Sequence, residues 1–430
     1  MCVMRLLIKN GVLVDPGQNL NGKYDILIEN GKIRGIRTLS IERDCVSIDA
    51  EGMYVVPGLV DMHVHLREPG FEHKETIHTG AEAAAAGGFT TIVCMPNTAP
   101  VIDDSETVKY IQKKAQAECV NTYMLGSITQ KLEGEVLCDY ESLRKSGVVG
   151  ITDDGNTIAN AKVMYEALEK AGRCELLTCV HCEDKNLVCD NSIHRGTASK
   201  QLGLSGRPSV SEDIIVARDI LIAESLGSKI HIQHVSSGNS VRLIRDAKKR
   251  GVQVSCEATP HHFTLTEDCI IQQGSNAKMS PPLRSRKDVE EIKKGLKEGI
   301  IDVIATDHAP HTEEDKGQDI LKAANGIVGL ETSLGLAMTY LVHTGNIEIK
   351  RLIELMSLNP SELLGLNKGT LKVGKDADIT IIDPHKKWTV DKNLFKSKGK
   401  NTPFHGMELT GKAVMTIVEG EVVYNDINER

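Results

Sequence analysis

Apolar and polar positions divide the chain into a long middle part and two shorter ends. The middle part, from about Tyr54 to Leu366, contains eight apolar runs of strand length: VVPGLVDMHVH, TTIVCMPN, NTYMLGSI, GVVGITDDG, LLTCVHCED, KIHIQHVS, VQVSCEATP and DVIATDHAP. Segments between these runs, such as 82–86, 108–118 and 214–226, carry apolar residues at three- and four-residue spacing, which predicts helices. Eight β/α units in succession favour an α/β fold with a closed parallel (β/α)8 barrel of the TIM type over an open sheet.

The two ends of the chain resemble each other and differ from the middle. Strand patterns surround Asn10-Gly11, Asn30-Gly31 and Glu419-Gly420, and residues 371–382 alternate as a further strand. Asn-Gly between alternating apolar positions predicts a hairpin, because both turn residues must adopt positive φ. We therefore expect one small β-sandwich domain built from both ends, with the chain divided at 1–53, 54–366 and 367–430. Two unrelated β appendages are the alternative that the pattern leaves open.

Composition excludes several classes of partner. The chain has 430 residues, 40% hydrophobic and 26% charged, with a net charge of -8 and no basic run, which argues against a nucleic-acid partner. Eleven scattered cysteines in a chain this long predict a reducing compartment, the cytoplasm. No apolar run is long enough to cross a membrane, and the start MCVMRLLIKNG lacks a cleavage-type ending. We therefore expect a cytoplasmic protein with no membrane or nucleic-acid partner.

Side chains with metal-binding chemistry gather at the C-terminal ends of the predicted strands, where a barrel of this type places its active site. His63 and His65 lie two apart in GLVDMHVHLREPG, so both imidazoles project from one face of a strand and can hold a divalent metal. Arg67 continues the alternation with a planar cation that suits a carboxylate ligand. Later strands end at Asn97, Asp153-Asp154, His181, His234 and Asp307, and the last is followed by His308 and His311. Four histidines and two carboxylates suit two metals that share a bridge, or one metal with spare ligands nearby.

Some residues near the strand ends also fit roles unrelated to a metal. Asp153-Asp154 could cap the helix that follows. Cys179 and Cys182 form a C-x-x-C pattern that is typical of zinc thiolate sites, but no second such pattern is present, and alternation places Cys182 opposite His181. We expect four further histidines to lie outside the site: His73 and His78 as solvent-facing side chains, and His261 and His262 as structural ones.

Longer motifs carry a family resemblance. GLVDMHVHLREPG with the following FEHKETIHTGAEAAAAGGFTTIVCMPNT, and later ATDHAPH with GIVGLET, are similar to signatures of the amidohydrolase superfamily and, within it, of dihydroorotases of the long-chain bacterial type. The resemblance extends over essentially the whole chain. It implies zinc-dependent, reversible interconversion of N-carbamoyl-L-aspartate and L-dihydroorotate plus water, a step of de novo pyrimidine (UMP) biosynthesis.

The resemblance also implies residue roles. By position, the implied zinc ligands are His63, His65, Asp154, His181, His234 and Asp307. The implied substrate contacts are His65, Arg67, Asn97, Ser280, His311, Asn325 and Gly326.

The sequence departs from the family pattern at several positions. Many relatives, hydantoinases and dihydropyrimidinases included, bridge two metals with a carboxylated lysine after strand four. VVGITDDG has no lysine, so Asp154 either bridges two zinc ions directly or the site holds a single zinc. Ser280 stands where the family usually carries Asn and has a shorter reach, and Ala324-Asn325 replaces a more usual Pro-Phe type pair.

A ring amide is a poor electrophile and water a poor nucleophile, and zinc answers both needs by lowering the pKa of water towards ~7 and polarising the carbonyl. Asp307 is the residue we expect to pass the proton from water to the leaving nitrogen. Two alternatives are a related cyclic amidohydrolase of the allantoinase or hydantoinase type, which Arg67 disfavours, and a catalytically silent assembly subunit, which the complete ligand set disfavours. The sequence leaves open whether the protein forms a homodimer and whether it associates with aspartate transcarbamoylase.

Overall fold

The computed structural model describes residues 5–37, 45–188, 190 and 192–427. Its middle part contains eight parallel strands: β8 (Leu59–Val64), β9 (Phe89–Cys94), β10 (Asn121–Met124), β11 (Gly150–Thr152), β12 (Leu177–Val180), β13 (Ile230–Ile232), β14 (Val254–Ala258) and β15 (Val303–Ile304). They pair in chain order within two sheets, β8 to β10 and β11 to β15. Parallel bridges between Gly126 and Ile151 and between Val64 and His308 join these sheets at both seams. The predicted closed barrel is confirmed.

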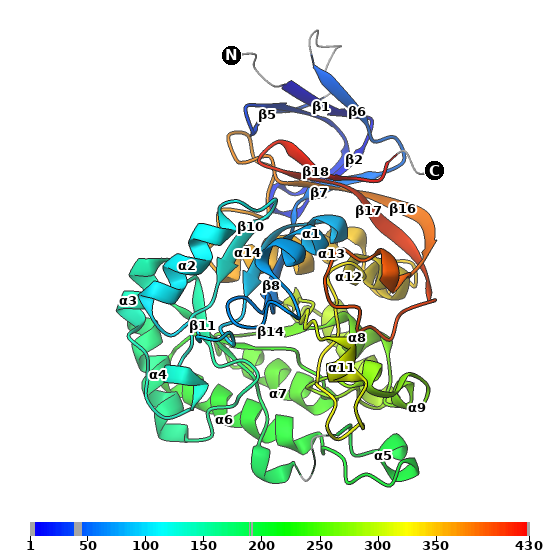
Figure 1. Ribbon diagram of the computed structural model, residues 1–430. Coiled ribbons are helices and arrows are strands. Elements are labelled where there is room, and N and C mark those ends of the chain that lie inside the picture. Colours follow the sequence, from blue (N-terminus) through cyan, green and yellow to red (C-terminus); the bar gives the residue numbers. More distant parts are fainter. Residues whose placement is uncertain (1–4, 38–44, 189, 191, 428–430) are drawn as a thin grey trace.

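Helices connect the strands and surround the barrel (Figure 1). The longer ones are α1 (Ile77–Gly87), α2 (Ser105–Ala115), α3 (Tyr140–Ser146), α4 (Ala161–Arg173), α6 (Val210–Leu226), α7 (Gly238–Lys249) and α10 (Arg286–Lys297). The shorter ones are α5 (Thr197–Gln201), α8 (Pro260–Thr264), α9 (Cys269–Gln273), α11 (Glu313–Lys316), α12 (Ser333–Ala337), α13 (Ile349–Ile353) and α14 (Asn359–Leu363). The predicted helical segments 82–86 and 214–226 lie within α1 and α6, and the segment 108–118 overlaps α2, which ends at Ala115. Among the described residues, no helix has the length and apolar character that a bilayer span requires.

Helix α2 shows why these segments are helical. The carboxylate of Asp104 accepts hydrogen bonds from the backbone N–H groups of Glu106 and Thr107, which caps the first turn. Val108 and Ile111, three residues apart, are both fully buried. The exposed face is polar, so the period of the apolar positions fixes which side of the helix faces the barrel.

Both ends of the chain form one β-sandwich, at the top of Figure 1, where both termini also lie. One sheet has the order β18-β17-β16-β7-β2-β3, from β2 (Val12–Asp15), β3 (Leu20–Lys23), β7 (Tyr54–Pro57), β16 (Ile379–Thr389), β17 (Glu408–Val418) and β18 (Glu421–Asn425). The other has the order β5-β4-β1-β6, from β1 (Arg5–Lys9), β4 (Asp25–Glu29), β5 (Lys32–Arg37) and β6 (Val46–Asp49). Buried aliphatic side chains of both sheets form one hydrophobic cluster. The predicted sandwich is confirmed, and the alternative of two unrelated appendages is wrong.

Two of the three predicted hairpins are present. Asn30-Gly31 joins β4 to β5 with Glu29 opposite Lys32, and Glu419-Gly420 joins β17 to β18 with Val418 opposite Glu421. The hairpin at Asn10-Gly11 is wrong, because β1 pairs with β4 and β6, whereas β2 pairs with β3 and β7 in the other sheet. Asn10 does adopt a positive φ of 65°. A turn sequence determines the local backbone conformation, but it does not determine which strand becomes the partner.

The junction between sandwich and barrel lies within a single apolar run. VVPGLVDMHVH forms two strands, because β7 pairs with β2 and β16 in the sandwich while β8 begins the barrel. Gly58 separates them at a tight packing point, where an added Cβ would lie 2.1 Å from Thr90 Oγ1. The division of the chain at 53/54 and 366/367 stays a prediction; the structure places strand 54–57 in the sandwich sheet.

Candidate metal centre and active site

The C-terminal ends of the barrel strands surround a cavity of about 390 Å³. Among the residues predicted from the sequence, those that line it are His65, Arg67, Asn97, Asp154, His181, His234, Ser280, Asp307, His311, Asn325 and Gly326. Residues that the sequence did not single out also line it: Gly155, Glu183, Lys185, Arg207 and Ala309. His63 is fully buried and reaches the same cluster of carboxylates. The structure therefore brings every predicted site residue to one end of the barrel.

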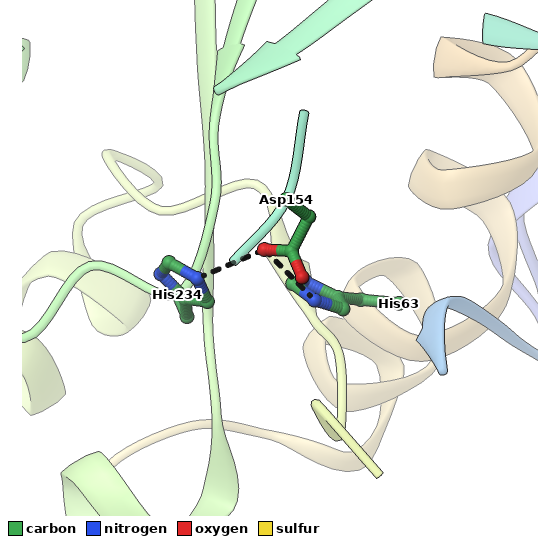
Figure 2. Close-up of side chains that lie close together, drawn as sticks. All are labelled: His63, Asp154 and His234. Atoms are coloured by element: carbon green, nitrogen blue, oxygen red, sulfur yellow. Dashed lines mark ion pairs between the residues drawn. The ribbon is translucent and has the colours of Figure 1, made fainter. Parts of the chain in front are cut away.

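Asp154 lies at the centre of the candidate metal cluster. Its Oδ1 is 3.5 Å from His63 Nε2, 3.6 Å from His181 Nδ1 and 3.4 Å from His234 Nε2. Figure 2 shows this carboxylate between His63 and His234. Its other oxygen, Oδ2, is 3.4 Å from His65 Nε2. A single carboxylate therefore faces histidines from β8, β12 and β13, which is the position that a bridging ligand needs.

Asp307 forms a second group with the two histidines of the first strand. Its Oδ1 is 3.0 Å from His65 Nε2 and 3.5 Å from His63 Nε2. In tetrahedral zinc sites with bonds of about 2.0–2.1 Å, neighbouring ligand atoms lie about 3.3 Å apart, which is close to these separations. In the part of the chain that the structure describes, His63 Nε2 and Asp154 Oδ1 are buried without a hydrogen-bond partner. The cluster therefore has the donor atoms, the spacing and the unsatisfied polar groups that fit a metal.

Side-chain partners orient two of the histidines. His63 Nδ1 is hydrogen-bonded to the carboxylate of Glu257, so its Nε2 faces Asp154 and Asp307. Glu257 also accepts from His231 Nε2 at 3.1 Å. His65 Nδ1 is 2.9 Å from Asn97 Oδ1. The N–H₂ group of Asn97 takes no part in this hydrogen bond. Such outer contacts fix the tautomer and ring orientation of metal-ligating histidines.

Sequence reasoning missed Glu257 and His231, although both carried a signal. Each is a polar side chain inside an apolar strand run, and both are fully buried. A buried carboxylate without a partner is costly, so an acid in such a run indicates a nearby cation or donor. Burial alone would raise the pKa of Glu257, but the charge of His63 and hydrogen bonds from His231 and His63 hold it well below its usual value.

The electrostatics keep the two candidate ligand carboxylates ionised. Burial alone would raise the pKa of Asp154, but the charge of His63 and the close approach of His181 and His234 hold it well below its ordinary value. The pKa of Asp307 is lowered in the same way, since burial is outweighed by its hydrogen bond with His65 and the charge of His63. Carboxylate ligands must be deprotonated to bind a metal, so both are in the required state.

Arg67 and His311 lie side by side on another wall of the cavity. The alternation predicted for Arg67 is wrong, because β8 ends at Val64 and Arg67 has a positive φ of 61°. Its Nε nevertheless donates to Pro310 O at 3.3 Å, and its Nη2 is 3.3 Å from His311 Nε2. His311 Nε2 is also 2.8 Å from Asn325 O. The cation therefore lines the cavity because of contacts with the loop after β15.

The charge states of this wall follow from burial. Burial lowers the pKa of Arg67 to about 10, so the guanidinium remains protonated at neutral pH. Burial and the adjacent charge of Arg67 lower the pKa of His311 to about 3, so this imidazole is neutral. The wall thus presents one planar cation beside a neutral histidine, a suitable combination for an anionic ligand.

Ser280, one of the predicted substrate contacts, has a charged partner. Its Oγ accepts a hydrogen bond from Arg207 Nη2 at 2.7 Å. Arg207 is itself buried and donates from Nε to Glu183 Oε1 at 2.8 Å. Because the hydroxyl oxygen accepts from Arg207, its own hydrogen is free to point elsewhere. No local pattern indicates this triad, since its members are far apart along the chain.

Asp153 and the two cysteines of the C-x-x-C pattern contact other parts of the barrel. Asp153 Oδ1 accepts from the backbone N–H groups of Ile128 and Thr129 at 2.8 and 3.0 Å, so it supports the loop after β10. Helix capping by Asp153-Asp154 is wrong, because α4 begins at Ala161 with Asn160 as its N-cap. Cys179 and Cys182 lie in separate hydrophobic clusters, and burial raises the pKa of both thiols well above normal.

Three of the four histidines expected to lie outside the site are exposed or make structural contacts; His261 is buried, and among the described residues its Nε2 has no hydrogen-bond partner. His73 and His78 are exposed. His261 and His262 are buried, and His262 contacts Thr259 Oγ1 at 2.8 Å and Pro281 O at 3.1 Å, which is a structural role.

Comparisons with known proteins agree with this geometry. The sequence profile of the Amidohydrolase family matches residues 54–423. The chain belongs to this amidohydrolase family. It is 48% identical over 426 residues to a dihydroorotase of Syntrophus aciditrophicus, covering 98% of this chain and 100% of that protein. It is 49% identical over 423 residues to a dihydroorotase of Acetivibrio thermocellus, covering 98% and 99%.

Within the family, this amidohydrolase falls among the dihydroorotases, so the resemblance found in the sequence is confirmed.

Solved structures extend the comparison to the fold. An L-hydantoinase (dihydropyrimidinase) from Arthrobacter aurescens matches with a TM-score of 0.88 at 30% identity, over 98% of this chain and 96% of that one. A D-hydantoinase (dihydropyrimidinase) from Thermus sp. matches with a TM-score of 0.83 at 28% identity, over 98% and 95%. Barrel and sandwich together are therefore the shared unit.

Proposed function

We propose that this amidohydrolase is a dihydroorotase that interconverts L-dihydroorotate plus water with N-carbamoyl-L-aspartate at a site with two zinc ions. The observation that carries the proposal is a single cavity with two kinds of wall. One wall is a cluster of four histidines and two carboxylates, and the other presents the Arg67 guanidinium. An enzyme that hydrolyses a ring amide with a metal needs the first wall to hold the metal. If the ring bears a carboxylate, the enzyme also needs a cation such as Arg67 to bind it.

Six residues would hold the metal: His63, His65, Asp154, His181, His234 and Asp307. Asp154 faces histidines of both groups, so it would be the residue shared between the ions of a two-zinc site. β11 and the turn after it, residues 150–155, contain no lysine, so no lysine at this strand end can serve as a carboxylated bridge. Lys185 also lines the cavity, but its Nζ donates to Asn156 Oδ1 at 2.8 Å. When bound, zinc lowers the pKa of water and polarises a carbonyl oxygen.

Asp307 is the residue that would move the proton. It is ionised, buried at the end of the last strand, and 3.0 Å from His65 Nε2. In ring opening it takes a proton from the attacking water and gives it to the ring nitrogen as the C–N bond breaks. In ring closure the same carboxylate takes the proton from the ureido nitrogen and returns it to the departing oxygen.

Arg67 would decide between substrates. Its guanidinium stays protonated and lines the cavity next to His311. Dihydroorotate carries a carboxylate that this fork can bind through two hydrogen bonds, whereas hydantoin and dihydrouracil rings carry none. The carboxylate-bearing ring is therefore the substrate that the cavity favours over those of the related hydantoinases.

Arg67→Met tests the substrate assignment, because methionine keeps much of the apolar volume and removes only the fork. A charge-assisted hydrogen bond contributes roughly 1.5–3 kcal/mol, so kcat/KM on dihydroorotate should fall by roughly ten- to a hundredfold or more. The same ratio should be measured on an unsubstituted hydantoin or dihydropyrimidine, where we expect no loss, and zinc content should be unchanged. An equal drop on both kinds of substrate would mean that Arg67 supports the metal site or the fold.

Cytoplasmic location and protein partners belong to the proposal as well. The nine cysteines that the structure describes are all free, which supports a reducing compartment. A homodimer and an association with aspartate transcarbamoylase stay predictions. Light scattering of the purified protein, alone and mixed with aspartate transcarbamoylase, tests both.

A further inference from the structure

Asn401 contacts the cavity wall although it belongs to neither the barrel strands nor the metal cluster. It lies between β16 and β17, in a segment that leaves the sandwich and returns to the barrel. Its side-chain Oδ1 accepts from the backbone N–H of His311 at 2.9 Å, and its Nδ2 donates to Ala309 O at 3.0 Å and Gly326 O at 3.1 Å. The side chain is 5% exposed. Both ends of the amide are therefore occupied by backbone groups of the barrel.

These contacts join the two loops that carry the substrate wall. Ala309 and His311 follow β15, whereas Asn325 and Gly326 come from the next loop, and all four residues line the cavity. The loops lie very close together, because a Cβ added at Gly326 would be 2.6 Å from Ala309 Cβ. The N–H₂ group of Asn401 donates to one carbonyl in each loop, Ala309 O and Gly326 O. The spacing between His311 and the Asn325-Gly326 backbone thus depends on it directly.

Lys316 supports the same loop from a second direction. Its buried ammonium donates to Ala324 O and Gly326 O, each at 2.9 Å, and to Lys278 O at 3.1 Å. Gly326 O therefore accepts from both Lys316 and Asn401. Two donors on one carbonyl hold this peptide in a single orientation, which is unusual for a loop.

The segment that carries Asn401 is itself anchored to the barrel by two carboxylates. Glu331 accepts from the backbone N–H groups of Lys396 at 2.9 Å and Ser397 at 3.1 Å. Glu75 accepts from the backbone N–H of Lys398 at 3.1 Å and contacts His308 Nε2 at 3.3 Å. Asn401 is thus presented from a fixed support, not from a free loop.

We infer that Asn401 is a positioning residue for substrate: it holds the His311 and Asn325-Gly326 walls at the spacing that the bound ring requires, and it leaves metal binding unaffected. This inference rests on the proposed function, since it concerns how that same cavity holds dihydroorotate. It assigns part of the active site to a segment from the sandwich side of the chain.

Asn401→Asp is the sharpest test, because the shape is kept and the acceptor for His311 N–H remains. Only the N–H₂ group is lost, and an anionic oxygen replaces it against two carbonyls. We expect KM for L-dihydroorotate to rise by roughly tenfold or more, with kcat changed much less and zinc content equal to wild type. The matched control is Asn393→Asp on the same segment; Asn393 is exposed, and its Nδ2 contacts Asp391 Oδ1 at 2.9 Å. The control variant should have the same KM and kcat as wild type.

Asn401→Ala and the double variant Asn401→Ala/Lys316→Met extend the test. Because both residues donate to Gly326 O, their effects on KM should be non-additive. An unchanged KM in folded, zinc-replete Asn401→Asp would overturn the inference. Loss of folded protein, or of zinc, in both single Asn401 variants would also overturn it, because the role would then be structural. Wild type without activity on dihydroorotate would instead refute the proposed function, which separates the two failures.

Discussion

The metal wall and the substrate wall of the cavity are built in different ways. The metal wall consists of side chains at strand ends, and its carboxylates and histidines are buried and oriented by further charged groups such as Glu257. The substrate wall consists of loops: Arg67 has left-handed backbone, and the Asn325-Gly326 peptide is held by donors from elsewhere. The barrel strands bring the metal ligands to one end, in or just after each strand, and Glu257 then orients His63. The loop residues of the substrate wall depend on long-range supports for their position. Changes in the metal wall should therefore alter occupancy and turnover, and changes in the substrate wall should alter KM.

The largest effect is expected at Asp154. Asp154→Ala removes the carboxylate that faces His63, His181 and His234. Zinc content and activity should fall together, with turnover close to background. Asp153→Ala is the matched control, because Asp153 binds backbone N–H groups of the loop after β10; it should keep most of its zinc. Metal analysis of both purified variants gives the answer. Equal zinc in wild type and Asp154→Ala would remove Asp154 from the metal wall.

Asp307→Asn separates metal binding from proton transfer. The amide keeps the shape and one oxygen near His65, but it cannot accept and return a proton. At matched zinc content, turnover should fall in both directions by about 10²–10⁴-fold, the range for general acid–base catalysis. Rates of ring opening and ring closure, measured after zinc is restored, check this. Near-normal rates in the zinc-replete variant would assign the proton transfer to another group.

Glu257→Gln tests whether the outer contacts of the metal wall matter. Glutamine keeps the volume but loses the negative charge that orients His63 through Nδ1. Zinc affinity should fall by about 10–100-fold, as is typical when such a partner of a metal-bound histidine is changed. Asp219→Asn is the control, since it removes the charge of another buried carboxylate, one that pairs with Arg218. Competition with a chelator measures both; equal zinc retention in the two variants would contradict the prediction.

The smallest effect is expected at Ser280, on the substrate wall. An asparagine there can accept from Arg207 through Oδ1, as Ser280 Oγ does, and extend its N–H₂ group into the cavity. Ser280→Asn should therefore leave KM for dihydroorotate unchanged or lower it, by less than about tenfold, because a single neutral hydrogen bond is involved. Steady-state kinetics at equal zinc content are sufficient. A large rise in KM would show that the cavity has repacked around the hydroxyl.

The metal wall was largely predictable from the sequence, and the substrate wall much less so. His63 and His65 could be assigned to one face because strand periodicity is two, and the other ligands follow apolar runs of the same barrel. Arg67 was placed in the right cavity for a wrong reason, since the strand ends three residues before it. Its position depends on Pro310 and His311, more than 240 residues away along the chain. No local pattern reports such a contact.

The apolar periodicity and the turn residues of this chain determined the eight strands, the main helices, two of the hairpins and the gathering of metal-ligand residues at one end of a barrel. These features depend on near neighbours, since a side chain's face follows from its position in a strand or helix. Only the tertiary structure decided that β1 and β2 enter different sheets and that Glu257 orients His63. It also decided that Arg207 lines the cavity and that Asn401 contacts the backbone of the cavity wall. These contacts form between segments that meet only when the barrel closes and the sandwich packs. The physical reason is that a buried polar group must find a partner in space, and which partner it finds depends on the packing of the whole chain.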